Sequence, residues 1–562
     1  MITTDKWQCR EVINLLVAYG VKRVVLSPGT RNTPLIMAAV RHPGLQTYSV
    51  IDERSAGFIA CGMCRQSGSP VAVICTSGSA ALNLTPAISE AYYSHLPVIA
   101  VTADRPAEWI DRDDSQTIRQ PRLMQDITVA QTSVTCHCGS QDVRDAIRRD
   151  LNVTLAKAVE CQHGPAHINV EIDEPISAEV DLTDVEALSC RKINFHFNNS
   201  LSLTDLSEVV NELGSAKRIM VVAGFDSGFT AGQKRMITDF AKRDNVTLLA
   251  EPLSDINCDC AVTMIDEVMM LINSRETAYY PDIVITLGGS LVSRPLKEFL
   301  RKTKARHWMV GHHDAYPDCF GRLSDIFPET EAFISLLSSV GKVDSDYHAI
   351  WNSVRLNARE LRKEFMNRND WCGLTAVDNI LRKMPVDWHL QLSNGMAVRY
   401  AMGYPMLRAA SVSCNRGVSG IDGSFSTAVG GNAVASGNSL FITGDMSAQY
   451  DMGAIASGLI DSRFRVVVMM NGGGEIFRVI KTTRKLPELD SYVAAHVNFP
   501  ARRLAEAFGF TYVEAFDSQQ LEAALPILYG KSEKPVMLAV FVDSNTSAKL
   551  YRDYLRLFRE TD

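Results

Sequence analysis

The sequence predicts an α/β fold with three doubly wound, parallel-sheet domains. Its 562 residues are enough for three or four domains, since a domain usually takes about 150 residues. Short β-rich apolar runs alternate with helical stretches along the chain, which is typical of parallel strands joined by crossover helices. Hydrophobic residues make up 46% of the chain and charged residues 22%, so several apolar cores can form. Ligands of such sheets bind beyond the carboxyl ends of the strands.

The first domain is expected over residues 1–183. The runs that predict its strands are VKRVVLSPG, TYSVIDE, PVAVICTSGSA, LPVIAVTADRP and PAHINVEID. A polar, poorly periodic stretch at 184–200 predicts a linker. The second domain, 200–340, repeats the pattern with RIMVVAGFDSG, NVTLLAE, PDIVITLGGS and RHWMVGHH, but it has no dinucleotide-binding GxGxxG motif.

A charged helical passage at 344–370 leads into the third domain, which is expected over 360–562. Its predicted strands are WHLQLSNG, AASVSCNRG, SLFITGDMS, FRVVVMMNGGG and PVMLAVFVD. Glycines follow several of these runs, as they do where a strand turns into a helix. The motifs at the strand ends therefore matter most for function.

The charge balance disfavours nucleic acid and membrane partners. The chain has 57 Lys and Arg against 64 Asp and Glu, a net charge of −7, without the basic excess that polyanions require. Apolar runs are too short to span a bilayer, and Asp5 and Glu11 lie where a signal peptide needs an apolar run. We therefore expect a cytoplasmic protein with no membrane insertion.

The 13 cysteines are an odd number and are scattered, which predicts mostly free thiols. Three clusters lie at 61–64, 136–138 and 258–260. The first, CGMC, suits the buried side of a helix better than a redox turn. The two Cys-x-Cys pairs lack a second ligand pair at zinc-finger spacing, so buried or strand cysteines are favoured over metal. A CxxC thiol oxidoreductase stays open as an alternative.

The strongest motif is GDMS at 444–447, followed by NGGG at 471–474. Ser447 is expected to cap a helix over AQYDMGAIASGLI, so that N–H groups near 446–448 face a diphosphate. The Asp445 carboxylate, the Asn471 amide and a glycine carbonyl are the hard ligands that Mg²⁺ prefers. Either motif alone would favour a simple turn, but their order and spacing favour a diphosphate and metal site.

The two motifs resemble the diphosphate-binding signature of thiamine diphosphate enzymes, and TSGSA at 76–80 resembles the turn of their pyrimidine-binding domain. The resemblance implies the fold of the thiamine diphosphate-dependent decarboxylases, with a pyrimidine-binding first domain and a diphosphate-binding third domain. It implies that Glu53 activates the cofactor through its aminopyrimidine ring. The cofactor-binding residues that it implies are Glu53, Ser77, Gly78, Asn83, Asn394, Gly395, Ile421, Gly444, Asp445, Met446, Ser447, Asn471, Gly473, Ile476 and Phe477. The implied ligands of Mg²⁺, or of Mn²⁺, are Asp445, Asn471 and Gly473.

Four further segments narrow the resemblance: SPGTR at 27–31, TADRP at 102–106, QTIRQP at 116–121 and SCNRGVSGIDG at 413–423. Together they resemble the 2-succinyl-5-enolpyruvyl-6-hydroxy-3-cyclohexene-1-carboxylate synthase family of menaquinone biosynthesis. That family decarboxylates 2-oxoglutarate and adds the resulting succinyl carbanion equivalent to isochorismate. Both substrates are dianions, so local cations are needed. The substrate-binding residues that the resemblance implies are Thr30, Arg31, Arg105, Gln116, Arg294, Arg399 and Arg416. The implied catalytic residues are Glu53 and Gln116.

The sequence departs from this family at a few positions. Arg294 precedes Pro295 where a Lys is common, which weakens its assignment to a substrate carboxylate, and Gly395 stands where a Ser is common. The resemblance implies a homodimer as the smallest competent unit, with a dimer of dimers as the larger assembly. Another thiamine diphosphate-dependent 2-oxo acid decarboxylase or carboligase, and a non-catalytic paralogue, are the alternatives.

Overall fold

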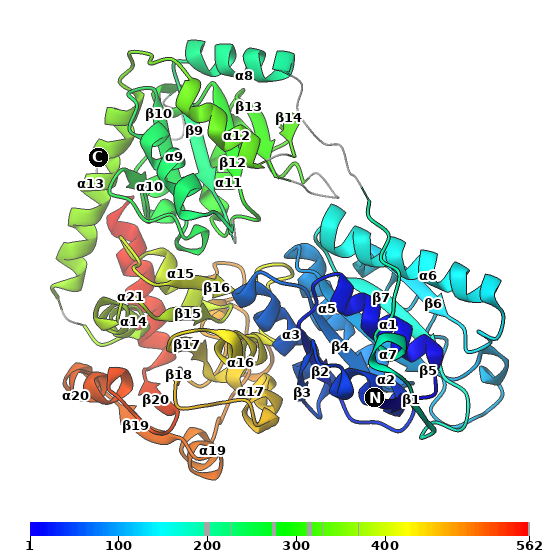
Figure 1. Ribbon diagram of the computed structural model, residues 1–562. Helices are drawn as coiled ribbons and strands as arrows, with labels where there is room; N and C mark the ends of the chain where they lie inside the picture. Colours follow the sequence, from blue (N-terminus) through cyan, green and yellow to red (C-terminus); the bar gives the residue numbers. More distant parts are fainter. Residues whose placement is uncertain are drawn as a thin grey trace. The chain divides into compact units, whose positions relative to one another are not determined.

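The computed structural model describes residues 1–195, 203–225, 228–272, 277–311, 317–328, 330–368 and 370–559, without the side chains of 203–206 (Figure 1). The expected start of the second domain at 200 lies outside these ranges. The chain forms two compact units. One comprises Met1–Phe197, Asn415–Ser436 and Tyr450–Phe464, and the other comprises Asn198–Cys414, Gly437–Gln449 and Arg465–Asp562.

Three parallel sheets of six strands each, all within the described ranges, confirm the predicted α/β class. The first sheet has the order β3-β2-β4-β5-β7-β6, the central one β11-β10-β9-β12-β13-β14, and the third β16-β15-β17-β18-β20-β19. In the first sheet the strands are β2 (Arg23–Leu26), β3 (Gln46–Ser49), β4 (Val71–Cys75), β5 (Val98–Asp104), β6 (Ala130–Val134) and β7 (Ala166–Glu171).

Alternate residues of the first sheet pack into two separate cores. In β4, Ala72 and Ile74 join one hydrophobic cluster, whereas Val71 and Val73 join another. The first cluster includes α1 (Trp7–Ala18), α2 (Thr33–Arg41) and α6 (Gln141–Ala156), and the second includes α3 (Glu53–Ser67) and α5 (Thr85–Tyr93). Because successive side chains of a strand point to opposite faces, this division shows a sheet covered by helices on both sides.

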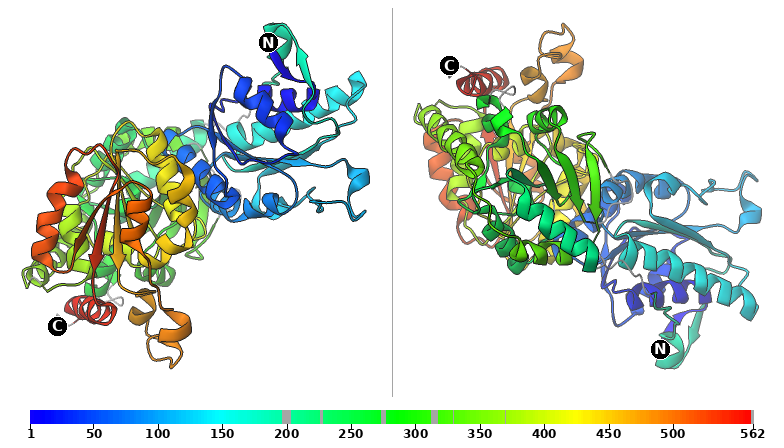
Figure 2. Two further views of the ribbon diagram at one scale, coloured as in Figure 1. Left: turned by 90° about the horizontal axis from the view of Figure 1, so that it is seen from below. Right: turned by 90° about the horizontal axis from the view of Figure 1, so that it is seen from above.

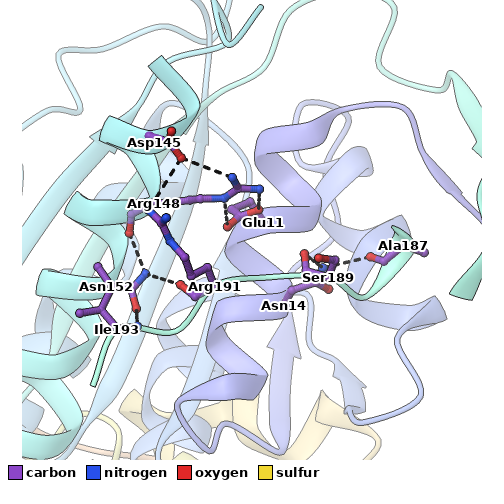
Figure 3. Close-up of polar contacts among 9 residues, drawn as sticks. All are labelled: Glu11, Asn14, Asp145, Arg148, Asn152, Ala187, Ser189, Arg191 and Ile193. Atoms are coloured by element: carbon purple, nitrogen blue, oxygen red, sulfur yellow. Dashed lines mark hydrogen bonds and ion pairs between the residues drawn. The ribbon is translucent and has the colours of Figure 1, made fainter. Parts of the chain in front are cut away.

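The stretch predicted as a linker instead lies largely against the first sheet's helices. After β8 (Glu179–Asp181), which pairs antiparallel with β1 (Ile2–Thr4), the chain forms the short helix α7 (Asp184–Ala187). Asn14 Nδ2 donates to the carbonyls of Ala187 (3.0 Å) and Ser189 (3.3 Å), and Asn152 binds the backbone of Arg191 and Ile193 (Figure 3). The linker prediction is therefore wrong for 184–193, because buried amides of α1 and α6 bind its backbone; residues 196–200 lie outside the described part.

Helix α3 is buried almost all round, because α16 (Ser424–Val434) packs closely along it. A Cβ added at Gly62 would lie 2.0 Å from the Thr427 carbonyl oxygen, and one at Gly430 would lie 2.1 Å from that of Ile59. The two helix backbones thus approach each other where only glycine fits. Cys61 and Cys64 are buried here, as predicted, and all 13 cysteines of the chain are free thiols.

The second unit contains the central sheet and the third sheet. The central strands are β9 (Ile219–Ala223), β10 (Val246–Ala250), β11 (Ala261–Val262), β12 (Ile283–Leu287), β13 (Arg306–Val310) and β14 (Leu323–Phe327). The third sheet consists of β15 (His389–Leu392), β16 (Ser411–Cys414), β17 (Ser439–Gly444), β18 (Phe464–Met470), β19 (Thr511–Ala515) and β20 (Val536–Phe541).

Helices lie on both sides of the central sheet (Figure 2). In β9, Ile219 and Val221 pack with α9 (Ala231–Ala241) and α12 (Thr330–Leu336), whereas Met220 and Val222 pack with α10 (Ile265–Leu271) and α11 (Arg294–Lys302). The core that contains Met220 and Val222 extends through α13 (Tyr347–Met366) to the third sheet. The remaining helices of that core are α14 (Gly373–Lys383), α15 (Met396–Met402), α20 (Ser518–Tyr529) and α21 (Ser544–Leu557). Within the described ranges, no helix has both the length and the apolarity to cross a membrane.

Candidate active site

Glu53 is the first residue of α3, and three residues separate it from the carboxyl end of β3. Asp52 caps this helix, since its Oδ1 accepts hydrogen bonds from the backbone N–H groups of Arg54 (2.9 Å) and Ser55 (3.3 Å). Burial raises the pKa of the Cys75 thiol, and the charge of the partly exposed Glu53 adds to that effect. Because Cys75 is the last residue of β4, Glu53 lies close to the turn that follows it.

That turn, Thr76-Ser77-Gly78, is held by two glutamines of the QTIRQP segment. Ser77 Oγ donates to the backbone carbonyl of Gln116 (3.0 Å), and Gln116 Nε2 donates back to the carbonyl of Ser77 (3.2 Å). The Gly78 N–H donates to Gln120 Oε1 (2.8 Å). Gly78 has φ +82°, and a Cβ there would meet Gln116. The structure thus brings together Ser77, Gly78 and Gln116, three of the residues that the resemblance assigns to the site.

Behind the turn lies a buried polar network that the sequence did not reveal. Gln120 Nε2 donates to Asn169 Oδ1 (2.9 Å), and Asn169 Nδ2 donates to Asp104 Oδ2 (2.9 Å). Burial raises the pKa of Asp104 to about 6, against the lowering effect of its hydrogen bonds. His167 joins through Thr102 Oγ1 (2.8 Å), and burial lowers the pKa of His167 to about 4. These groups fix the position of Gln120 and, through it, of Gly78.

The predicted anion-binding arginines of the first domain lie in ion pairs. Arg31 is buried, donates to the Ile172 carbonyl (2.9 Å) and pairs with Glu174 (3.0 Å). Arg105 pairs with Asp114 (2.9 Å) and donates to the Ser115 carbonyl (3.1 Å). Thr30 and Asn83 are exposed. An anionic ligand would therefore have to share these arginines with their acidic partners or replace those partners.

The loop that carries Arg416 is fastened to α5 by Glu90, a residue that no motif indicated. Glu90 is fully buried, and its two carboxylate oxygens accept hydrogen bonds from the N–H groups of Gly417 (2.9 Å) and Val418 (2.9 Å). Arg65 lies 3.7 Å from the same carboxylate and donates to Asn415 Oδ1 (3.3 Å). This arrangement fixes both neighbours of Arg416. Ile421, farther along the loop, is partly exposed.

In the second unit, Asp445 is the first residue of α17 (Asp445–Tyr450), directly after Gly444 at the end of β17. Asp445 Oδ2 accepts hydrogen bonds from the backbone N–H groups of Asn471 (3.0 Å) and Gly472 (2.6 Å), and Oδ1 accepts one from Met446 (2.8 Å). Burial raises the pKa of Asp445 to about 6 despite these bonds. The two halves of the diphosphate motif therefore meet at one carboxylate.

The predicted cap and helix at this point are wrong. Ser447 is buried in the first turn of α17 rather than preceding it, because Asp445 already opens the helix and bonds to the N–H of Met446. The expected long helix is also interrupted after Tyr450, and the chain continues as a 3₁₀ helix over Met452–Ser457.

The Asn471 side chain is oriented by Glu475, a second acid that the motif did not indicate. Asn471 Nδ2 donates to Glu475 Oε2 (2.8 Å), and the Tyr400 hydroxyl donates to Glu475 Oε1. Because Nδ2 donates to Glu475, the free lone pairs of the Asn471 side chain are on Oδ1. This oxygen accepts a hydrogen bond from the N–H of Gly473 (3.3 Å). Burial raises the pKa of Glu475 to about 7, and the charge of Asp445 adds to that effect.

Asp445, Asn471 and Gly473 offer ligands that fit a divalent cation such as the predicted Mg²⁺. A carboxylate, the oxygen of an oriented amide and the carbonyl of Gly473 are hard oxygen ligands, and a cation would favour ionised Asp445. The Gly473 carbonyl already accepts from the N–H of Glu475 (2.9 Å) but keeps a second lone pair. In the described residues, no three His, Cys, Asp or Glu side chains cluster as a metal site, and the proposed set needs only one acid.

The other predicted residues of this unit surround the same strand ends or lie apart from them. Asn394 is buried after β15, and Gly395 has φ +96° at the start of α15, where its carbonyl accepts a bond from Arg399 (2.7 Å). Ile476 and Phe477 are partly exposed at the start of α18 (Ile476–Val479). Arg294 opens α11 and pairs with Glu298 (2.8 Å), and its side chain is 88% exposed, so no contact here ties it to a site.

Comparison with known proteins gives one consistent result. Residues 10–123 match the family described as thiamine pyrophosphate enzyme, N-terminal TPP binding domain. A 2-succinyl-5-enolpyruvyl-6-hydroxy-3-cyclohexene-1-carboxylate synthase of Porphyromonas gingivalis is 35% identical, over 98% of this chain and 97% of the relative. The synthase of Flavobacterium johnsoniae is 33% identical over 97% and 98%, and that of Bacteroides fragilis 32% over 98% and 99%. The chain therefore belongs to the 2-succinyl-5-enolpyruvyl-6-hydroxy-3-cyclohexene-1-carboxylate synthase family of thiamine diphosphate enzymes.

Proposed function

We propose that this protein is a thiamine diphosphate-dependent transferase of menaquinone biosynthesis that decarboxylates 2-oxoglutarate and joins the remaining succinyl unit to isochorismate. The products would be 2-succinyl-5-enolpyruvyl-6-hydroxy-3-cyclohexene-1-carboxylate and CO₂. The observation that carries the proposal is the Asp445 carboxylate, which joins the end of β17 to the N–H groups of Asn471 and Gly472 at the end of β18. The names of the relatives that match over almost their full length give the product, and the family that the sequence resembles gives the substrates.

The chain's own residues would hold the cofactor at two places. Asp445, Asn471 and the Gly473 carbonyl would bind Mg²⁺, which neutralises the diphosphate beside a buried carboxylate. Glu53 would hold a proton between its carboxylate and the aminopyrimidine ring. When bound, thiamine diphosphate supplies a thiazolium that accepts the electron pair released as CO₂ leaves. The turn at Ser77 and Gly78, fixed by Gln116 and Gln120, would support the pyrimidine side.

The substrates would be bound as carboxylates by arginines. Arg31, Arg105, Arg399 and Arg416 are the candidates, since a guanidinium binds a carboxylate bidentately. Glu90 would keep Arg416 in place by holding the two backbone N–H groups that follow it. The side chain of Gln116 would orient substrate or relay a proton, and it can do so only by leaving or sharing its bond to Ser77. Arg294 and Thr30 stay predictions with less support, because both are exposed.

We also propose the division into a pyrimidine-binding domain (1–183), a central domain (200–340) and a diphosphate-binding domain (360–562). The competent enzyme would be a homodimer, or a dimer of dimers, in which one subunit supplies Glu53 and the other supplies Asp445. The substrates are small, charged metabolites, and the net charge of −7 gives no basic surface excess for a membrane, which supports a cytoplasmic location.

Turnover of the Glu53→Gln variant tests the proposal. CO₂ release from 2-oxoglutarate should require isochorismate for full rate, and Glu53→Gln should lower kcat at least about 100-fold while cofactor binding persists. Glu533→Gln, an exposed position, is the matched control and should behave as wild type. Unchanged turnover in Glu53→Gln would contradict the mechanism, and equal CO₂ release without isochorismate would indicate a simple decarboxylase.

A further inference from the structure

Two cysteines of the central sheet's loop region face each other at unusually short range. Cys258 and Cys260 lie between the 3₁₀ helix Pro252–Ser254 and β11, and their Sγ atoms are 2.7 Å apart. Both side chains are partly buried, so the sulfurs are packed against the core but not sealed inside it. The two sulfurs are thus in direct contact, as two thiols must be before they can form a disulfide.

The surroundings of this pair favour thiolate chemistry. Lys242 and Arg355 both interact electrostatically with the two thiols, and nearby cations stabilise a thiolate, although the charge of Asp259 opposes ionisation of Cys258. Arg355 also donates a hydrogen bond from α13 to the carbonyl of Asp259, the residue between the cysteines, which holds the loop in place. By contrast, Cys61 and Cys64 are buried in a helix, where no oxidant can reach them.

We propose that Cys258 and Cys260 form a thiol–disulfide exchange site that takes a low-molecular-weight disulfide, such as glutathione disulfide, as its oxidant. The Cys258 thiolate attacks one sulfur of the oxidant, forms a mixed disulfide and releases one thiolate. Cys260 then loses its proton and attacks Cys258 Sγ, which breaks the mixed disulfide and releases the second thiolate. Two protein thiols become one disulfide, and the oxidant takes up two electrons and two protons as two thiols.

We expect the two sulfurs to play different roles. Their mutual contact lowers the pKa of Cys258 and raises that of Cys260, while burial raises both. Cys258 is therefore the attacking thiol and Cys260 the resolving one. A disulfide across a single intervening residue closes a small, strained ring, which makes it easily reduced. The site is thus a reversible redox modification site rather than a structural crosslink, and it does not depend on the proposed synthase activity.

The test is oxidation of the purified full chain by glutathione disulfide, followed by alkylation and mass spectrometry of the peptides. The peptide that contains both cysteines should lose two hydrogens as the disulfide forms. This reaction should be about fivefold faster than the uptake of glutathione by the partly exposed Cys161. The reason is that a larger fraction of Cys258 is ionised, which outweighs the lower nucleophilicity of each thiolate. Dithiothreitol should restore both thiols.

Single substitutions separate the two roles. In Cys260→Ser, which keeps a hydroxyl donor, Cys258 should retain one glutathione, whereas in Cys258→Ser the remaining Cys260 should react more slowly. Cys260→Ala, which removes the donor, should slow the reaction of Cys258. A wild-type chain that keeps glutathione on Cys258 while Cys260 is still alkylated would overturn the proposal. So would reaction of both cysteines no faster than that of Cys161.

Discussion

Gln116 and Ser77 are joined by two reciprocal hydrogen bonds, one from Ser77 Oγ to the Gln116 carbonyl and one from Gln116 Nε2 to the Ser77 carbonyl. Gln116 also has φ +59°, a left-handed conformation that a non-glycine residue adopts at a cost. The backbone of Gln116 is therefore fixed by the turn, while its side chain is exposed and has only one bond to give up. This is the arrangement expected of a side chain that positions substrate.

Replacing Gln116 by Ala separates its two roles. The variant keeps the bond from Ser77 Oγ and loses only the exposed bond from Nε2, so the free energy of unfolding should fall by no more than about 1 kcal/mol. If the side chain acts on the reacting groups, kcat should fall at least about tenfold. Chemical denaturation and steady-state kinetics on one preparation measure both. A loss of stability without a loss of kcat would mean that Gln116 is only structural.

Glu90→Gln tests the fastening of the Arg416 loop. Glutamine offers an NH₂ group where the carboxylate now accepts bonds from Gly417 or Val418, and it leaves the buried Arg65 without its charge partner. The free energy of unfolding should fall by about 3 kcal/mol, as when a buried ion pair loses one member. KM should rise more than kcat falls, because Arg416 would be misplaced.

Ser94→Ala is the milder control for that change. It removes one hydrogen bond from a neutral hydroxyl to the same carboxylate (2.8 Å) and should cost about 1.5 kcal/mol. Equal effects of the two variants on stability and KM would show that the charge of Glu90 has no special role.

Glu267→Gln should change how stability depends on pH. Burial raises the pKa of Glu267 in the folded protein to about 7, whereas an unfolded Glu titrates near ~4.3. Below the unfolded value both states are protonated and the group has no effect. Above the unfolded pKa the unfolded chain loses the proton of Glu267, whereas the folded protein keeps it until the pH passes the folded pKa. The free energy of unfolding therefore falls as the pH rises from the unfolded pKa through the folded one.

The wild type should therefore lose about 2 kcal/mol more than Glu267→Gln between pH 5 and pH 8. The amide oxygen of Gln can still accept the bond from the Tyr554 hydroxyl (2.9 Å), so the variant should fold. Denaturant unfolding at the two pH values measures the difference. Parallel pH profiles of the two proteins would show that Glu267 is not protonated in the folded protein near neutral pH.

Gly62→Ala should disrupt the packing of α3 on α16. The new Cβ would lie 2.0 Å from a backbone oxygen that cannot move independently, so we expect a loss of about 1–3 kcal/mol in stability. Gly431→Ala, on the same α16, is the control, since the nearest atoms to its Cβ are 3.9 Å away. That variant should be neutral or slightly stabilising, because Ala favours helix. Thermal unfolding of both variants distinguishes these outcomes.

The strands that sequence patterns missed are mostly at sheet edges. β6, β11, β14 and β19 were not predicted, and each lies at the end of its sheet's strand order. Three of them are only partly buried, with runs such as AQTSV in β6, because an edge strand has one neighbour and needs fewer apolar residues. The central strands were predicted because both of their faces are covered, which requires continuous apolar runs.

The residues of the candidate site also divide into those that the sequence predicted and those that it did not. Motif residues such as Asp445 and Asn471 were predicted because their order along the chain matches a known pattern. Glu90, Gln120 and Glu475, which hold the motif residues in place, belong to no such pattern, since each acts through contacts with residues far away or with backbone groups. Only the folded chain reveals that these side chains are buried and bonded. The same holds for Asn14 and Asn152, which bind the stretch predicted as a linker.

The most direct test of the account is calorimetric titration of thiamine diphosphate into the purified protein, with and without Mg²⁺. We predict Mg²⁺-dependent binding by the wild type and by the exposed control Asp387→Asn, and affinity reduced at least about 100-fold in Asp445→Asn. Absence of binding under Mg²⁺ or Mn²⁺, or equal affinity in Asp445→Asn and wild type, would contradict it.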